Sequence, residues 1–326
     1  MLQRLVVMVA CFGLLIGCVI QPPIIEKDTY SLSYEDSSLE SWWSFFNDPT
    51  LDRLVSSALS IASDNELSDN AIALNIMRKY VQYHYTQNQN NLLEQYIEKR
   101  NIEDKPQQIA LLKNKIELEN KAIDISIELA KATNLLPEYV TQILKKDAAM
   151  PSSDITTIFA SGASIAFNSP EIIAASALFV KNTGGATSLS DMKNIFPDIT
   201  FSRFFGITDG VYLNNNSSWG VAIGDSIRNL DLTELESRYS NNPAYIEFID
   251  NVYAGLVNIE RKIISYANME EQYIVLKNAA NEYEEKCLTA KDNNCDEAYN
   301  TALAALRAEY ERINILINLY EMIIPI

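Results

Sequence analysis

Apolar residues recur at alternating steps of three and four along the C-terminal third of the chain. This spacing is that of a coiled-coil seam and predicts two long helices, about 55 Å and about 40 Å in length at 1.5 Å per residue. The first helix carries the repeat Val252, Leu256, Ile259, Ile263, Tyr266, Met269, Tyr273, Leu276, Ala280, Tyr283 and Cys287. The second carries Tyr299, Leu303, Leu306, Tyr310, Ile313, Ile317 and Tyr320. Such stripes indicate a buried helical face and do not identify a function.

Helical spacing also dominates the N-terminal half. Asp48 at a capping position and Pro49 in the first turn open a short amphipathic helix that extends to Ile61. Residues 67–100 lack Gly and Pro, residues 101–106 interrupt the pattern, and a second helical run follows over residues 107–133. We expect these two runs to form a helical hairpin. The apolar stripe of the second run consists of Ile109, Leu112, Ile116, Ile123, Ile127 and Ala130.

The pattern changes between residues 150 and 238, where most of the glycines lie. Residues 199–205 and 218–224 alternate small or polar with large apolar side chains, and a cluster of three asparagines lies between them, so they predict a β-hairpin. Ser169, as a cap, and Pro170 open a helix that runs to about Lys181. The predicted fold class is therefore mainly α, with long antiparallel coiled-coil-like helices and a small β-hairpin portion.

A short apolar run near the N-terminus follows Arg4 and ends in Leu15-Ile16-Gly17-Cys18. The run is too short to span a bilayer and is typical of a signal peptide with a small residue before the cleavage site. We expect residues 1–17 to be a lipoprotein signal peptide and Cys18 to be the lipid anchor, carrying a thioether-linked diacylglycerol and a further acyl chain. Multiple acyl chains hold a protein stably on a membrane. The alternative is an ordinary secretory signal in which Cys18 occurs by chance.

The predicted domain organisation follows from this anchor. Residues 18–41 would be a lipid-anchored tether, since Pro22 and Pro23 favour extended backbone. Residues 42–326 would be the folded body, and 48% hydrophobic residues suffice for a substantial core. The formal net charge is −17, which argues against nucleic acid as a partner, because phosphate binding requires clustered Lys and Arg.

Two cysteines remain once Cys11 and Cys18 are set aside. Cys287 and Cys295 flank a turn-rich segment between the two C-terminal helical patterns, and an exported protein meets oxidising conditions. A disulfide between them would join the ends of the two helices. Free thiols or a metal site are the alternatives, and the chain's single histidine, His84, lies far from both in sequence.

The order of residues after the anchor resembles a known family. Trp42-Trp43, Phe46, Asp48-Pro49, Leu51-Asp52, Leu54-Val55, Ala58-Leu59, Asn65 and Leu67, spaced as they are after Cys18, resemble the opening of the lipoprotein branch of TolC-like outer membrane efflux proteins. In the second half, Ser169-Pro170-Glu171-Ile172 resembles the family's Arg-Pro-Asp-Ile segment. Phe196-Pro197 and Ile199 resemble its strand opening, and Trp219 stands where the second strand begins.

The resemblance implies a trimeric conduit through the outer membrane, with a β-barrel and a helical barrel that projects into the periplasm. It implies a periplasmic adaptor and an inner-membrane pump as partners, and no cofactor. The chain departs from the family because the first strand pair is missing between residues 67 and 92. A trimer with two strands per subunit would have six strands, too few for an open pore.

Two functions follow from the resemblance. The first is a lipoprotein channel component of a tripartite efflux or type I secretion system in the outer membrane. The second is a periplasm-facing structural or adaptor lipoprotein, derived from this family, that no longer forms an open channel.

An enzyme is the least favoured class: His84 is interpreted as a surface residue, and no nucleophile elbow, phosphate loop or metal cluster is present in the sequence. Scattered acidic residues of the middle segment are loop carboxylates, or the lining of a pore: Asp191, Asp198, Asp209 and Asp225.

Overall fold

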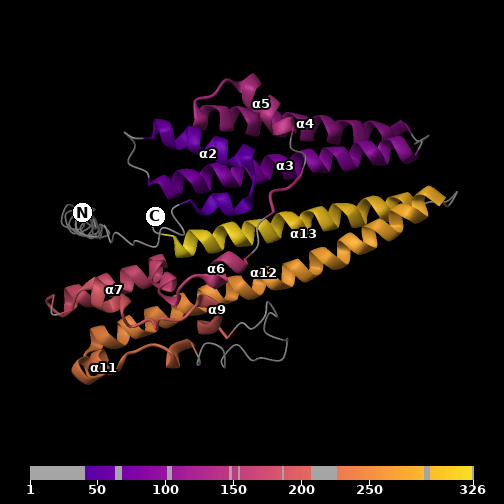
Figure 1. Cartoon of the computed structure of the whole chain (residues 1–326). Coiled ribbons are helices and arrows are strands. Elements are labelled where there is room, and N and C mark those ends of the chain that lie inside the picture. The colour runs from indigo at the N-terminus through magenta and orange to yellow at the C-terminus, as the bar shows by residue number, and fades with distance from the viewer. Residues whose placement is uncertain are drawn as a thin grey trace, which may run out of the picture. The chain divides into compact units, whose positions relative to one another are not determined.

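The apolar repeats of the C-terminal third form two long antiparallel helices in the computed structural model (Figure 1). Helix α12, Pro243–Thr289, has 47 residues, and α13, Asn294–Ile323, has 30. The predicted seam is buried where other helices cover it, for example at Leu256 and Ile317, and becomes half-buried toward the end where α12 meets α13. The structure describes residues 41–62, 68–100, 105–146, 149–152, 155–185, 187–206, 226–289 and 294–324.

The N-terminal half contains the predicted hairpin. Helix α2, Pro49–Ile61, begins as expected, because one oxygen of the Asp48 side chain accepts hydrogen bonds from the backbone N–H groups of Thr50 and Leu51. Helices α3, Asp69–Arg100, and α4, Lys105–Thr133, pack against each other. A further helix, α5, Pro137–Lys146, packs on α4.

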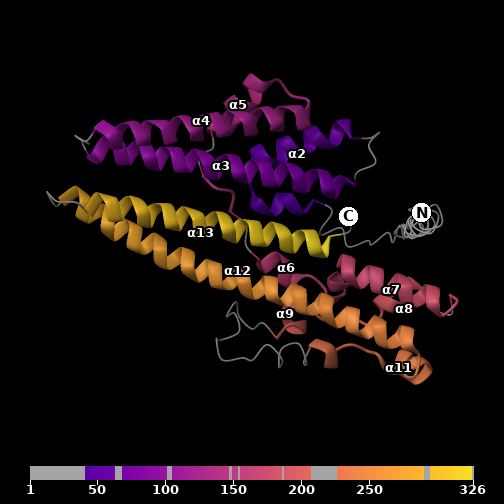
Figure 2. The same cartoon turned by 180° about the vertical axis from the view of Figure 1, so that it is seen from behind.

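Helix α3 also joins the two hairpins, because it runs antiparallel along α13. Two tyrosine pairs stack across this contact: Tyr85 on Tyr310 with centroids 4.2 Å apart, and Tyr96 on Tyr299 at 4.5 Å. Both views show the order α4, α3, α13, α12 across the molecule (Figure 2). The tyrosines of the α13 stripe therefore serve packing between helices of the same chain.

The start of the folded body is fixed by aromatic packing. In the short 3₁₀ helix η2, Trp42–Phe46, the Trp42 ring is fully buried and stacks on Tyr320 near the end of α13, with centroids 4.9 Å apart. Residues Ser41–Ile326 form one compact unit. The first and last elements of this unit are therefore in direct contact.

The first part of α12 is covered by α7, Pro170–Asn182 (Figure 1). Phe179 of α7 stacks on Phe248 of α12 with centroids 5.1 Å apart. Close approach of the two helices depends on Gly255, where an added Cβ would lie 2.6 Å from Cγ1 of Ile172. The predicted helix at Pro170 is confirmed, but the Ser169 side chain makes no capping bond; its hydroxyl instead donates to Glu171.

The middle segment differs from the prediction. Residues 199–205 were expected to be a strand, but Phe201–Phe204 form the short helix α9, preceded by a single isolated bridge between Gly162 and Thr200. Phe201, Phe204 and Phe205 are buried in a cluster of rings, a packing arrangement that alternation alone does not distinguish from a strand. The second expected strand, residues 218–224, lies outside the described residues. Short helices complete this part of the chain: α6, Thr156–Ala160, η3, Ala163–Asn168, α8, Leu189–Lys193, and α11, Thr233–Tyr239.

The mainly helical class is thus confirmed, and the described residues contain no strand. One predicted stripe is buried only at its C-terminal end: of its six residues, Ala130 is buried and Ile127 is half-buried, whereas the other four are exposed. On α4, Ile109, Leu112, Ile116 and Ile123 are 67%, 45%, 56% and 54% exposed. Helix α4 packs instead through a neighbouring set of residues, among them Ala122, Ile125 and Leu129. We call the four exposed residues the α4 outer stripe.

Candidate functional site

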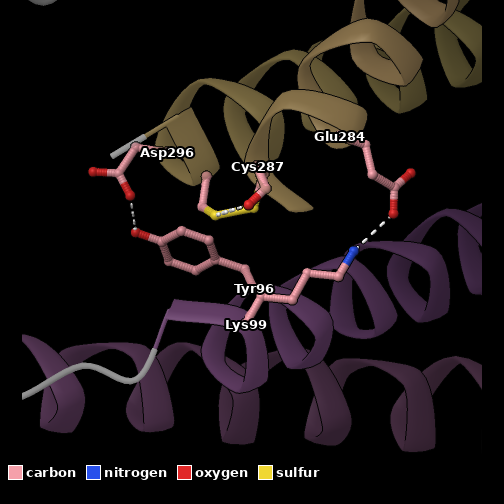
Figure 3. The surroundings of a disulfide bond; sticks show 6 residues. Tyr96, Lys99, Glu284, Cys287 and Asp296 are labelled. Carbon is pink, nitrogen blue, oxygen red and sulfur yellow. Dashed lines mark hydrogen bonds and ion pairs between the residues drawn. A yellow bond between two sulfur atoms is a disulfide. The ribbon is translucent and has the colours of Figure 1, made fainter. Parts of the chain in front are cut away.

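The junction of α3, α12 and α13 combines a disulfide, two polar contacts and a pocket. The structure contains a disulfide between Cys287, near the end of α12, and Cys295, in the first turn of α13, with Cα atoms 4.8 Å apart. Below it lies the Tyr96 ring of α3 (Figure 3). The covalent link therefore lies directly over the end of the first hairpin.

Two polar contacts connect α3 to α13 and α12, one on each side of this disulfide. The Tyr96 hydroxyl donates to Oδ1 of Asp296 at 2.6 Å, and Nζ of Lys99 lies 2.7 Å from Oε1 of Glu284 (Figure 3). One contact goes to α13 and the other to α12. Helix α3 thus contacts both helices that the disulfide connects.

A pocket of about 220 Å³ opens beside the disulfide. Both cysteines line it, together with the stacked rings of Tyr96 and Tyr299. Three alanines, Ala280, Ala298 and Ala302, lie where larger apolar residues would fill a helical seam. The pocket exists because these side chains are small.

A second polar network crosses the α12/α13 pair farther along. Arg312 of α13 forms an ion pair with Glu270 of α12, and its guanidinium carbon lies 5.3 Å from the centre of the Tyr273 ring. The Tyr273 hydroxyl donates to Glu309 at 3.2 Å. Burial raises the pKa of Glu309, and the hydrogen bond from Tyr273 opposes this shift. An ion pair and a hydrogen bond therefore join α12 and α13 in this region.

His84 is buried, not on the surface as the sequence suggested, since it is only 1% exposed. Its ring lies against those of Tyr80 and Tyr83, and Nε2 has no hydrogen-bond partner among the described residues. Desolvation lowers the pKa of His84 to about 4, opposed by the charge of Asp48. Asp48 is itself occupied, because it caps α2 and accepts a 2.6 Å bond from Tyr80. The rings of Tyr80, Tyr83 and His84 pack against one another, so we assign this cluster a packing role.

Glu260 is the most unusual buried group. It lies on α12, is 1% exposed, and neither carboxyl oxygen has a hydrogen-bond partner in the described part of the chain. Burial raises the pKa of Glu260 to about 7. Its position next to the seam residues Ile259 and Ile263 could have signalled burial, but the sequence shows no partner that would explain it.

Of the other predicted site residues, Asp191 and Asp198 lie in the described part of the chain, and both are exposed. Asp191 belongs to a capping box with Ser188 at the start of α8, which explains it as a local structural residue. Cys18, Asp209 and Asp225 lie outside the described residues. Where the structure describes the chain, it contains no group of three or more His, Cys, Asp or Glu side chains that could hold a metal ion. Within that same part, no helix combines the length and apolar character needed to cross a membrane.

Comparisons with known proteins provide no assignment: no family model, no curated protein and no solved structure matches this chain. The residues and their geometry alone therefore carry the functional argument.

Proposed function

We propose that this chain is a non-catalytic, lipid-anchored assembly protein of the cell envelope, held on the outer membrane through Cys18 and binding further copies of itself through α4. It corresponds to the structural alternative expected from the sequence. The observation that carries the proposal is the α4 outer stripe. Four large aliphatic side chains on one face of a single helix, all at least 45% exposed, are typical of an interaction surface.

The spacing of the stripe fits a helical partner. Ile109, Leu112, Ile116 and Ile123 continue the three-and-four repeat of a coiled-coil seam over about 21 Å of helix. The inner side of α4 already packs on α3, so the helix has two apolar faces and only one is covered within the chain. A second helix laid along the outer stripe would bury the exposed face.

Charge favours a second copy of the chain as that helix. Helix α4 holds five lysines against four acidic residues, in a chain whose net charge is −17. The outer half of α12, residues 264–289, holds five glutamates against two lysines; Glu270 and Glu284 pair within the chain, and the other three remain in excess over the lysines. The same stretch exposes Ile274 and Val275, which are 48% and 61% exposed. We call Glu271, Ile274, Val275 and Glu282 the α12 acidic patch. Contact between the α4 outer stripe of one copy and this patch on another places lysines against glutamates and buries apolar groups from both.

Self-association of the full chain, purified in detergent, tests this proposal. Sedimentation velocity should show an oligomer for the wild type and a monomer for Ile116→Glu, because a carboxylate in the middle of the stripe cannot be buried without a partner. Ile274→Lys should also dissociate the oligomer. As a matched control, Ile246→Glu alters a 53% exposed isoleucine at the start of α12 and should leave the oligomer intact. A wild-type monomer at all concentrations would overturn the self-association.

The lipid anchor has a separate test. Cys18→Ser should abolish incorporation of labelled palmitate and release the protein from the membrane fraction, without changing the association of the body. Retention of both label and membrane binding would contradict the anchor while leaving the α4 surface untouched.

A channel component of a tripartite efflux or type I secretion system is the second candidate function. The observation in its favour is the pair of antiparallel hairpins, α3/α4 and α12/α13, packed side by side, since a twofold repeat is what the resemblance to TolC-like proteins implies. A periplasmic adaptor and an inner-membrane pump would then be its partners. Conductance of the purified protein in planar bilayers would support this candidate, and an oligomer without conductance would support the assembly protein.

A further inference from the structure

We propose that the pocket beside the Cys287–Cys295 disulfide is a binding site for a small, uncharged, mainly apolar aromatic molecule. The site, which we call the junction pocket, is lined by residues of α3, α12 and α13. This inference is independent of self-association through α4.

The size of the junction pocket sets the size of its ligand. An apolar cavity of about 150 Å³ is sufficient to bind benzene. The junction pocket has about 220 Å³, which leaves room for a bicyclic aromatic molecule. The space is part of the fold, because Ala280, Ala298 and Ala302 come from two different helices and all leave it unfilled.

The lining favours an aromatic ligand without net charge. Tyr96 and Tyr299 present ring surfaces, and the disulfide adds polarisable sulfur. The charged groups Lys99 and Glu284 pair with each other at 2.7 Å, so the pocket offers no uncompensated charge to an ion. The Asn281 side chain supplies an amide that can bond one polar group of the ligand.

The contacts around the disulfide favour a free small molecule over an inserted side chain of another protein. Tyr96–Asp296 on one side and Lys99–Glu284 on the other join α3 to the second hairpin (Figure 3). Because these contacts hold α3 close to α12 and α13, the space between the helices is that of the junction pocket alone, which matches a molecule of the size of two fused rings.

Indole is a suitable probe, because it is uncharged, bicyclic and carries one N–H donor. Titration calorimetry of the full chain with indole should show saturable binding. At about ten times its Kd, indole should raise the midpoint of thermal unfolding by about 2 °C. Absence of saturable binding up to the solubility limit of indole would overturn the proposal.

Variants that fill the junction pocket test whether indole binds there. Ala298→Leu adds three carbon atoms to the wall and should weaken indole affinity at least about tenfold, since overlap with a packed ligand is not tolerated. Ala302→Leu provides a second variant from the next turn of α13, in case the first disturbs folding. Ala279→Leu is the matched control, because it makes the same change at the position next to Ala280 and outside the lining, and it should retain wild-type affinity. Undiminished binding in both filled variants would show that indole binds elsewhere and would overturn the assignment.

Discussion

Glu260 carries a free-energy penalty that depends on pH. The pKa of this carboxyl is raised by burial from an ordinary 4.5 to about 7. Between these values the folded chain holds a proton that the unfolded chain has lost, so the free energy of unfolding falls as pH rises from about 4.5 to 7. We expect Glu260→Gln to remove this slope and to stabilise the protein at pH 8 by on the order of 2 kcal/mol. Urea denaturation at a series of pH values measures both effects.

His84 produces the opposite slope. Its pKa is lowered from 6.5 to about 4, so between these values the unfolded chain binds the extra proton and stability rises with pH. The two slopes overlap between about pH 4.5 and 6.5 and partly cancel in the wild type. We expect His84→Leu to expose the falling slope of Glu260, and Glu260→Gln to expose the rising slope of His84. If the free energy of unfolding of the two variants had the same pH dependence, the assignment of Glu260 and His84 as buried, unpaired groups would be contradicted.

At the scale of elements, Gly255 determines how closely α7 and α12 approach. Alanine is the better helix former by about 1 kcal/mol, so Gly255→Ala would stabilise an isolated α12. In the protein the new Cβ would lie 2.6 Å from Ile172, and we expect a net loss of about 1–3 kcal/mol in the free energy of unfolding. Chemical denaturation measures this loss. In the Ile172→Ala background the same change should cost little or become stabilising, and an additive double variant would show that the steric explanation is wrong.

Helices were the elements that the sequence predicted best, because their signals are local. Asp48-Pro49 marks the start of α2, and the repeat from Val252 onward marks α12, as the structure confirms. The environment of each helix depends on non-local contacts and was less predictable. The α4 stripe has the spacing of a core seam, yet its exposure is decided by which face α3 covers.

The same limit applies to the candidate site. Cys287 and Cys295 could be paired from their spacing, but the junction pocket could not be found, because it requires α3, nearly 200 residues earlier in the chain, to reach the disulfide. The sequence predicted a surface position for His84 because several of its neighbours in sequence are polar. In the structure its ring is buried against that of Tyr80. Phe201–Phe204 resembled a strand because a cluster of buried rings and a strand share alternating apolar residues.

For the whole molecule, the disulfide constrains the connection between its two longest helices. The bond closes a short loop, since the cysteines are eight residues apart, and such a loop is worth about 2–3 kcal/mol through the entropy of the unfolded chain. We expect the Cys287→Ser, Cys295→Ser double variant to lose this amount in urea denaturation. A reductant should destabilise the wild type to the same extent and leave the double variant unchanged; a further loss in the double variant would point to an effect unrelated to this bond.

Because Trp42 stacks on Tyr320, the two ends of the folded body lie close together, and the order of the helices along the chain could be changed by circular permutation. The polypeptide begins and finishes its folded body at one spot, so a short linker could fuse these ends into a closed loop. New termini could then be opened between α3 and α4 while every helix remains whole. A circular permutant of this kind would keep its core and present free chain ends beside the junction of the two hairpins.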